Sequence, residues 1–197
     1  MNKIKMFIFM MMAVGVTGIF ISECKSVTTD DGFHNGKKIE RVMGSSEVTD
    51  GDLKGTFGYA DYVAVVKIQS EDTTNYKNVT QTETVKFGIP YTKYKVKVCE
   101  NLRGELPKDK EITVSKAGGL SIDGECYYVD EGDVLPEEGR YYIMSFCVQQ
   151  DGSLLASGAD TTIAIRHSVL GTQNIDRYRK ACKDCVIKKR DRYTYRR

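Results

Sequence analysis

A regular alternation of lysines with apolar residues in the middle of the chain constrains the fold more than any other feature. Successive side chains of a β-strand point to opposite faces, so the alternation predicts a strand with one buried face and one lysine face. The lysine row fits a solvated face, protection against edge-to-edge pairing, or a binding stripe. The alternating residues are Lys93, Tyr94, Lys95, Val96, Lys97 and Val98.

Other segments of the chain also read as strands, because they are β-branched or apolar and are bounded by turn residues. The pair Asp151-Gly152 predicts a hairpin turn, since both positions tolerate positive φ. A polar loop is expected at 70–78 and a strand break at 88–90. Further strands are expected at 59–69, 80–87, 111–115, 120–129, 140–149, 153–156 and 161–166. Gly124 is expected to interrupt the strand at 120–129, as a bulge would.

Two helices are predicted, one before the strands and one after them in the sequence. Asp52 is a suitable N-cap for a short helix that carries Leu53 and Phe57 on one side. Near the C-terminus, apolar residues recur at spacings of 3, 4 and 3, which is one stripe of an amphipathic helix. This stripe is expected to dock on the barrel, while residues 190–197 fray. The stripe consists of Ile175, Tyr178, Cys182 and Cys185.

The N-terminal segment predicts export. Lys3 and Lys5 precede an uncharged apolar run over residues 6–22. A run of this length fits either a short membrane-spanning helix or a signal peptide. In both cases the lysines stay inside and the rest of the chain is placed on the outer side of the cytoplasmic membrane.

Residues 21–24, at the end of this run, resemble the lipobox of bacterial lipoproteins, in which an aliphatic residue and two small residues precede a lipid-modified cysteine. The resemblance implies that Cys24 is the lipidated residue if the leader is cleaved. Glu23 departs from the pattern, because a small residue is expected there. Three routes therefore stay open, namely a lipoprotein, an uncleaved anchor and a secreted protein.

Charge is distributed unevenly along the chain. From Asp176 onwards, ten Lys/Arg residues face three Asp/Glu residues, whereas residues 25–175 are acidic overall. The basic end fits a solvated helix face or attraction to an anionic partner such as lipid headgroups, a wall polymer or an acidic protein. The residues predicted to contact such a partner are Lys188, Lys189, Arg190 and Arg192.

The chain has six cysteines, and an exported protein is free to oxidise them. Cys182 and Cys185 form a CxxC spacing, which occurs in thiol redox sites and in zinc sites. Here the spacing falls inside the predicted C-terminal helix, where the two residues also fit an apolar face or a local bridge. Candidates for disulfide bonds are Cys126, Cys147, Cys182 and Cys185.

Sequence motifs of catalysis do not occur in this chain. It lacks the nucleophile-elbow, zinc-protease and phosphate-loop patterns. The acidic stretch 130–139 is expected to be a solvated loop, since it lacks the ligand spacing of calcium loops. We therefore predict no enzyme activity, no catalytic residues, no cofactor and no metal. Export and the acidic body also disfavour nucleic acid binding.

The order of strand and turn phrases resembles a group of uncharacterised extracytoplasmic domains of Gram-positive lipoproteins. The phrases are VCENLRGELP, EITVSKAGG and RYYIMSF followed by Asp151-Gly152, and Arg103 stands where that group has Lys. The resemblance implies a mainly β, OB-like, partly open barrel of five or six strands, similar to the netrin-like module. It covers about residues 50–170.

The resulting prediction is a membrane-tethered binding module without enzymatic activity, with a surface protein or anionic polymer as its partner. The alternative is an exported thiol-disulfide oxidoreductase that uses Cys182 and Cys185. The expected parts are a signal peptide or anchor at 1–24, a flexible spacer at 25–50, the barrel at 51–170, and a basic helix and tail at 171–197.

Overall fold

The computed structural model describes residues 32–42, 51–82, 86–108, 110–166 and 173–196. Most of these residues lie in strands, and the two helices come before and after the main sheet. In chain order the elements are β1 (Phe33–His34), β2 (Lys37–Val42), α1 (Leu53–Tyr59), β3 (Tyr62–Gln81), β4 (Lys86–Arg103), β5 (Glu111–Ala117), β6 (Gly119–Leu120), β7 (Tyr127–Asp130), β8 (Tyr141–Val148), β9 (Leu154–Ala156), β10 (Thr162–Ile165) and α2 (Gln173–Asp184).

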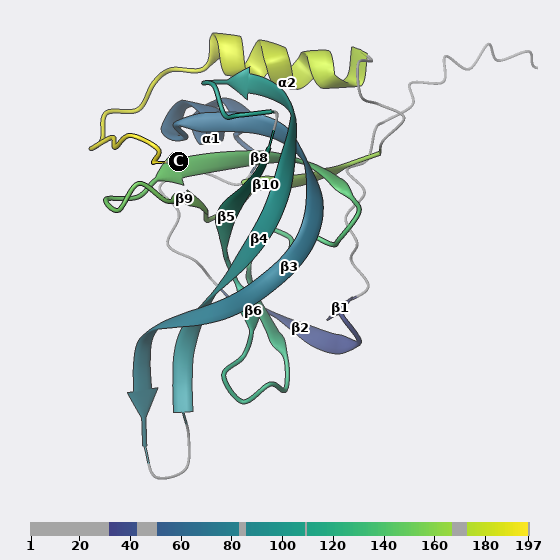
Figure 1. Cartoon of the computed structure of the whole chain (residues 1–197), viewed down its shortest axis with the longest axis vertical. Helices are drawn as coiled ribbons and strands as arrows, with labels where there is room; N and C mark the ends of the chain where they lie inside the picture. The colour runs from purple at the N-terminus through teal and green to yellow at the C-terminus, as the bar shows by residue number, and fades with distance from the viewer. Residues whose placement is uncertain (1–31, 43–50, 83–85, 109, 167–172, 197) are drawn as a thin grey trace, which may run out of the picture.

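Five strands close into a barrel (Figure 1). The ring order is β3, β4, β5, β9 and β8, and β8 pairs again with β3. All neighbours are antiparallel except β5 and β9, which are parallel. β10 adds an extra strand on the outer side of β8. The predicted mainly β, OB-like barrel with a helix near each end is therefore confirmed, and the ring is closed rather than partly open.

The ring closes because β3 bends enough to pair with two neighbours. Its first part, Tyr62 to Lys67, pairs with β8, while its whole length pairs with β4. Between Val63 and Ser70, the β3–β4 register shifts three times. Each shift inserts a local irregularity that increases bend and twist, as a closed barrel requires.

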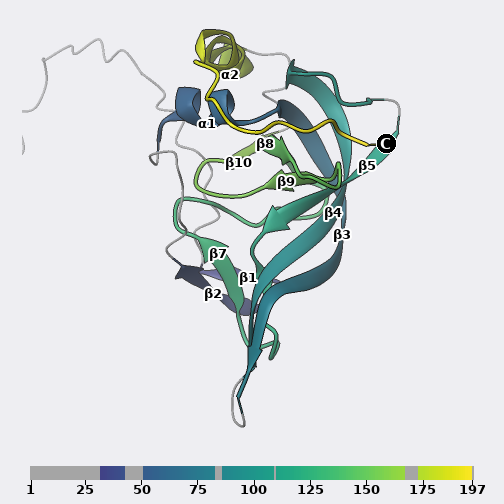
Figure 2. The same cartoon turned by 90° about the vertical axis from the view of Figure 1, so that its left-hand side faces the viewer.

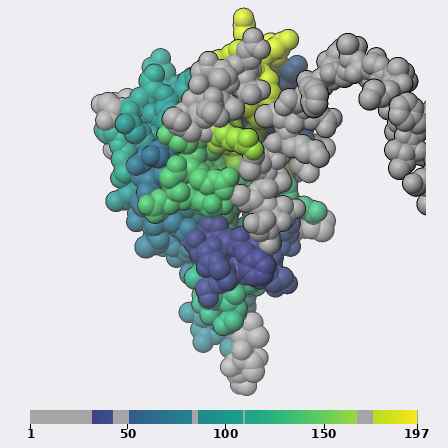
Figure 3. Space-filling model, turned by 90° about the vertical axis from the view of Figure 1, so that its right-hand side faces the viewer, coloured from purple at the N-terminus to yellow at the C-terminus, as the bar shows by residue number. Residues whose placement is uncertain are grey.

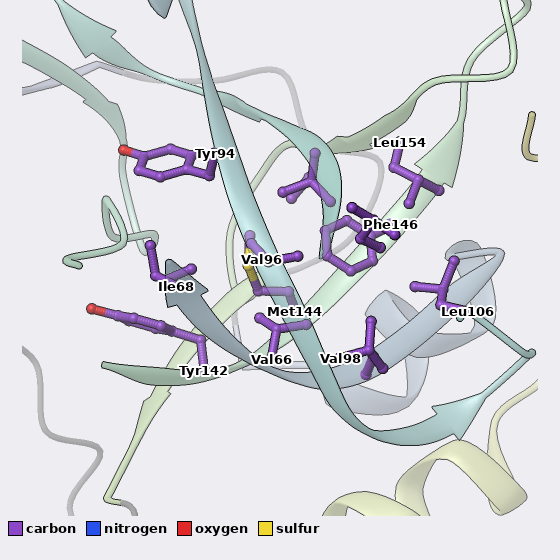
Figure 4. Packing of buried hydrophobic residues seen from close by; sticks show 14 of the residues in the cluster. Val66, Ile68, Tyr94, Val96, Val98, Leu106, Tyr142, Met144, Phe146 and Leu154 are labelled. Carbon is purple, nitrogen blue, oxygen red and sulfur yellow. The ribbon is translucent and has the colours of Figure 1, made fainter. Parts of the chain in front are cut away.

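The barrel interior is filled by the apolar face of the alternating strand and by its neighbours (Figure 4). Tyr94, Val96 and Val98 are at most 1% exposed, whereas the three lysines between and beside them are exposed. The predicted two-faced strand is thus confirmed. Inward-facing residues from other strands complete this core, among them Val66, Ile68, Met144, Phe146 and Leu154.

A second core lies outside the barrel, between its wall and the two helices. α2 packs over α1 on one side of the sheet (Figure 2). Ile175 and Tyr178 are 0% and 3% exposed and contact this cluster, so the predicted docking of the C-terminal helix is confirmed. The Asp52 cap is confirmed as well, because its carboxylate accepts a hydrogen bond of 2.9 Å from the Gly55 N–H.

β3 and β4 extend beyond the barrel as a two-stranded arm, formed by residues 72–81 and 86–91 (Figure 1). The predicted loop at 70–78 and the predicted break at 88–90 are therefore wrong. Both faces of the arm are accessible over much of its length, so polar residues pair there as strands without a buried apolar face. Pro90 has no N–H to donate to a neighbouring strand. It is tolerated because only its carbonyl takes part in pairing, accepting a 3.0 Å hydrogen bond from the Gly118 N–H.

A small second sheet, in the order β1, β2, β7 and β6, covers the base of the arm. β2 pairs in parallel with β7, so residues 33–42 are not the predicted flexible spacer. His34 is buried, and its Nε2 lies 3.2 Å from the Glu71 carboxylate on β3. Residues 25–31 and 43–50 of the predicted spacer lie outside the described residues. The predicted interruption at Gly124 is a turn rather than a bulge: Gly124 has φ +78°, and the turn divides the strand predicted at 120–129 into β6 and β7.

The acidic segment 130–139 is not simply a solvated loop. The side chains of Asp133 and of Lys116 on β5 are fully buried and form an ion pair. The Asp133 carboxylate also accepts hydrogen bonds of 2.9 Å from the Thr161 hydroxyl and from the Val134 N–H. Burial raises the pKa of Asp133, and Lys116 opposes that shift. A carboxylate in the apolar interior attracts the buried ammonium group, which a sequence pattern does not reveal.

Candidate functional site

The outward surface of the barrel at β4 carries the row of exposed lysines that the alternation predicted. Lys93, Lys95 and Lys97 all point away from the core. Side chains two residues apart on a strand are about 6.6–6.8 Å apart. The three ammonium groups therefore form a row that fits a partner with repeated negative charges.

A fourth lysine joins this row from the neighbouring strand. Lys67 on β3 lies directly opposite Lys97 in the register of the two strands. Its ammonium group is 5.8 Å from the centre of the Tyr141 ring on β8. Like charges placed directly opposite each other destabilise a sheet, so sheet stability does not account for this pair. Lys67, Lys93, Lys95 and Lys97 together form the lysine face.

The acidic neighbour of the lysine face, Glu111, neutralises little of the positive charge of the lysines. Lys95 is 4.0 Å from Glu111 on β5, and both side chains are about half exposed. An exposed pair at this distance contributes little, typically about 0.2–1 kcal/mol. In the β4–β5 register, Lys93 lies opposite Ser115, which carries no charge, and Lys97 lies opposite the same Glu111, so one carboxylate serves two lysines.

Sequence reasoning found three of the four lysines and missed Lys67. It lies in the apolar run of β3 between Val66 and Ile68, both fully buried. A lysine inside such a run signals that the run has an outward face. Its position opposite Lys97, however, depends on the register between two strands, which the sequence alone does not give.

Part of the basic C-terminal tail, residues 186–196, is bound within the protein and is therefore not free to contact an anionic partner. Arg190 and Arg192 both form ion pairs with Asp61, at 2.5 and 2.6 Å. The Asp61 side chain is only 9% exposed and also accepts a 2.8 Å hydrogen bond from the Val148 N–H. Of the four basic residues predicted to contact an anionic partner, only Lys188 and Lys189 have exposed side chains that the described contacts leave available.

Backbone contacts hold the same tail against the barrel, so the predicted fraying of residues 190–197 is wrong for 190–196. The Lys188 N–H donates to the Gly58 carbonyl at 3.1 Å, and the Arg196 N–H donates to the Gly152 carbonyl at 3.1 Å. A β-carbon at Gly58 would overlap with the carbonyl group of Val186. Glycine is therefore required where the tail crosses α1.

An open groove of about 500 Å³ lies between the tail, the start of β3 and the residues that follow β4. Its charged groups are largely engaged within the protein. Asp61 binds the two tail arginines, and Arg103 donates to the Phe57 carbonyl. The groove is lined by Asp61, Tyr62, Arg103, Gly104, Glu105, Ile187, Arg192 and Tyr193.

The cysteines named as disulfide candidates are free thiols in the described structure. Cys126 precedes β7 and Cys147 lies on β8. Cys182 lies in the last turn of α2 and Cys185 directly follows the helix, where its thiol donates to the Cys182 carbonyl at 3.0 Å. Burial, followed by the neighbouring Cys185, raises the pKa of Cys182 to about 12. Cys24 lies outside the described residues.

Metal-ligating side chains do not gather in groups of three or more within the ranges that the structure describes. Neither of the helices in those ranges has the length and apolar character needed to cross a membrane. The apolar run at 6–22 lies outside them. No known family model and no curated protein matches this chain.

Proposed function

We propose that this protein is a non-enzymatic binding module, tethered outside the cytoplasmic membrane, whose lysine face binds a partner with repeated negative charges. The observation that carries the proposal is the lysine face itself, four ammonium groups on the outside of two paired strands. The apolar run at 6–22 and Cys24 support the tether.

Fold analogy supports the choice of this surface. In chain order, the five barrel strands are β3, β4, β5, β8 and β9, so β4 and β5 are the second and third. OB folds commonly bind oligonucleotides and oligosaccharides across their second and third strands and the adjoining loops. The lysines on β4 make that surface suited to an anionic ligand, such as an anionic wall polymer or an acidic protein.

Charge substitution on the lysine face tests this function. A variant with Lys93→Ser, Lys95→Ser and Lys97→Ser is expected to bind inorganic polyphosphate about 10- to 100-fold more weakly than the wild type. Each lysine close to an anionic surface contributes about 1 kcal/mol, less where screening is stronger. The measurement is the dissociation constant of full-length protein in detergent at about 0.15 M salt, where the Debye length is about 8 Å, by titration calorimetry.

A second triple variant provides a control with the same change in net charge. Lys183, Lys188 and Lys189 are exposed on α2 and the tail, outside the lysine face, and their replacement by serine is expected to change the affinity less than about threefold. An equal loss in both variants would mean that only net charge matters. A larger loss in the tail variant would make the tail the binding site.

The alternative function, a thiol-disulfide oxidoreductase, requires a reactive Cys182 in the folded protein, whereas a binding module does not. With a pKa of about 12, roughly one thiol in 10⁵ is ionised at pH 7, and the thiolate is the reactive form. We expect native Cys182 to resist iodoacetamide at pH 7 and to react rapidly after unfolding in urea, as followed by peptide mass spectrometry. Rapid labelling of the native protein at pH 6 would favour the oxidoreductase instead.

The raised pKa of Cys182 also makes the folding stability depend on pH. The pKa of Cys182 is raised in the folded protein above its ordinary value of 9.0. Its contribution to stability is therefore present below pH 9 and is lost as the pH rises from 9 towards 12. In a Cys182→Ala variant this part of the alkaline loss of stability should disappear.

A further inference from the structure

Exposed apolar side chains gather at the end of the protein opposite the helices. Of the eight large apolar or aromatic residues that are well exposed within the described ranges, five lie on β1, β2 and the arm. Figures 1 and 2 both place these elements at one end and α2 with the tail at the other. The five residues are Phe33, Val42, Val79, Phe87 and Ile89.

Three of these residues project from the arm itself. Val79 and Phe87 are each 49% exposed and Ile89 is 39% exposed. Phe87 and Ile89 alternate with the buried Gly88 and Pro90, so they lie on one face of β4. Val79 lies on the opposite face, because a β-carbon at Gly88 would come within 3.2 Å of the Val79 side chain. Phe87 contacts the Tyr128 ring, with 6.2 Å between the ring centres, and still remains half exposed. Exposed apolar side chains on both faces of a projecting arm indicate a contact outside the protein.

Positive charges flank these apolar residues. Lys77 and Lys86 are exposed on the two strands of the arm, and Lys37 is exposed on β2 beside its base. Lys77 also stacks on Tyr91, with 4.5 Å between its ammonium group and the ring centre. Lysines around an apolar patch that includes aromatic rings suit the boundary between anionic headgroups and acyl chains.

The N-terminal segment enters the structure at the same end of the protein. Nine residues separate the apolar run at 6–22 from Gly32, and they span at most about 30 Å when fully extended. β1 follows at once and is fixed to the arm base, because His34 and Asn35 contact Glu71. Figure 3 shows residues 33–42 on the surface directly above the arm.

The dimensions of the arm match this tether. From Tyr94, which pairs with Glu71, β4 runs eight residues back to Lys86, or about 26 Å. A tether of at most about 30 Å and an arm of about 26 Å start from the same place. A membrane that holds the apolar run is therefore within reach of the arm.

We infer that the exposed apolar side chains of the arm, Phe87 and Ile89 on one face and Val79 on the other, dock into the lipid surface to which the N-terminal segment tethers the protein. This inference rests on the tether in the proposed function. It assigns the domain an orientation, with the arm towards the bilayer and α2 with the tail away from it. The lysine face on the barrel part of β4 then stands above the membrane, available to its own partner.

The absence of tryptophan from the chain makes the test specific. Full-length Phe87→Trp protein is reconstituted into vesicles of phosphatidylglycerol and phosphatidylcholine, with or without bromine on the acyl chains. A ring inserted about 5–10 Å into the interface should lose roughly half of its fluorescence to the brominated chains. Because position 87 is half exposed, far-UV dichroism should show an unchanged fold; Val79→Trp is the second probe and should be quenched as well.

The control probe is Ile187→Trp, which is exposed at the opposite end of the protein and should keep its fluorescence. If the protein floats with the vesicles but neither arm probe is quenched, the docking inference is wrong and the tether stands. If position 187 is quenched as strongly as position 87, the proposed orientation is wrong. If the protein does not float with the vesicles, the tether fails, and the docking inference fails with it.

Discussion

Asp133→Ala is expected to lower the free energy of unfolding by about 3–5 kcal/mol, because it leaves the buried ammonium group of Lys116 without its charge partner. The Thr161 hydroxyl and the Val134 N–H would lose their acceptor at the same time. Domains of this kind have a total stability of about 5–15 kcal/mol, so the variant should be close to unfolding at room temperature. Urea unfolding followed by far-UV dichroism measures the change.

The matched control removes both charges at once. A Lys116→Met, Asp133→Leu double variant buries two apolar side chains in place of an ion pair whose desolvation is costly. Such replacements are often neutral or stabilising. The double variant should therefore be clearly more stable than Asp133→Ala alone. If the two variants are equally unstable, the ion pair is not what Asp133 contributes, and packing of the 131–140 segment is the better explanation.

The second large effect is expected from Asp61→Ala, which should destabilise the protein by about 2–4 kcal/mol and release the tail. Asp61 is nearly buried and has three described donors: Arg190, Arg192 and the Val148 N–H. Without the carboxylate, the two guanidinium groups repel each other beside the barrel. Trypsin should then cut after Arg190 and Arg192 much faster than in the wild type, as peptide mass spectrometry would show.

Asp191→Ala is the control for Asp61. It removes one negative charge between the same two arginines, but the Asp191 side chain is exposed. Its loss should leave both the tryptic cleavage rate and the stability close to those of the wild type, because surface substitutions seldom exceed about 0.5 kcal/mol. Equal cleavage in both variants would contradict the role given to Asp61.

Together, the Asp61 contacts and the lysine face divide the basic residues into two groups. Arg190 and Arg192 hold the tail to the barrel, whereas the lysine face meets solvent. In the sequence the arginines looked like partner contacts and the lysines like a solvated face. Their roles differ because Asp61, 129 residues earlier than Arg190, lies next to the tail only in the folded protein.

Prediction of the strands was accurate for most strands with one buried face and failed for the arm and for residues 33–42, where neither face is buried over most of the length. The alternation at 93–98 and the hairpin turn at Asp151-Gly152 were correct, since a buried face imposes a period of two and a tight turn demands positive φ. The arm was missed because its two strands are held by pairing with each other, and polar residues there look like a loop. Residues 33–42 were missed for the same reason, since β7 holds them in place.

What the sequence by itself determined is the local periodicity: a two-faced strand, an amphipathic C-terminal helix and a capped helix at Asp52. These depend on residues a few positions apart, so they can be read directly. Tertiary structure alone decided the closure of the ring, the burial of Lys116 with Asp133, and which cations remain accessible. Each depends on side chains brought together from distant positions, where burial strengthens electrostatic attraction and no local pattern records it.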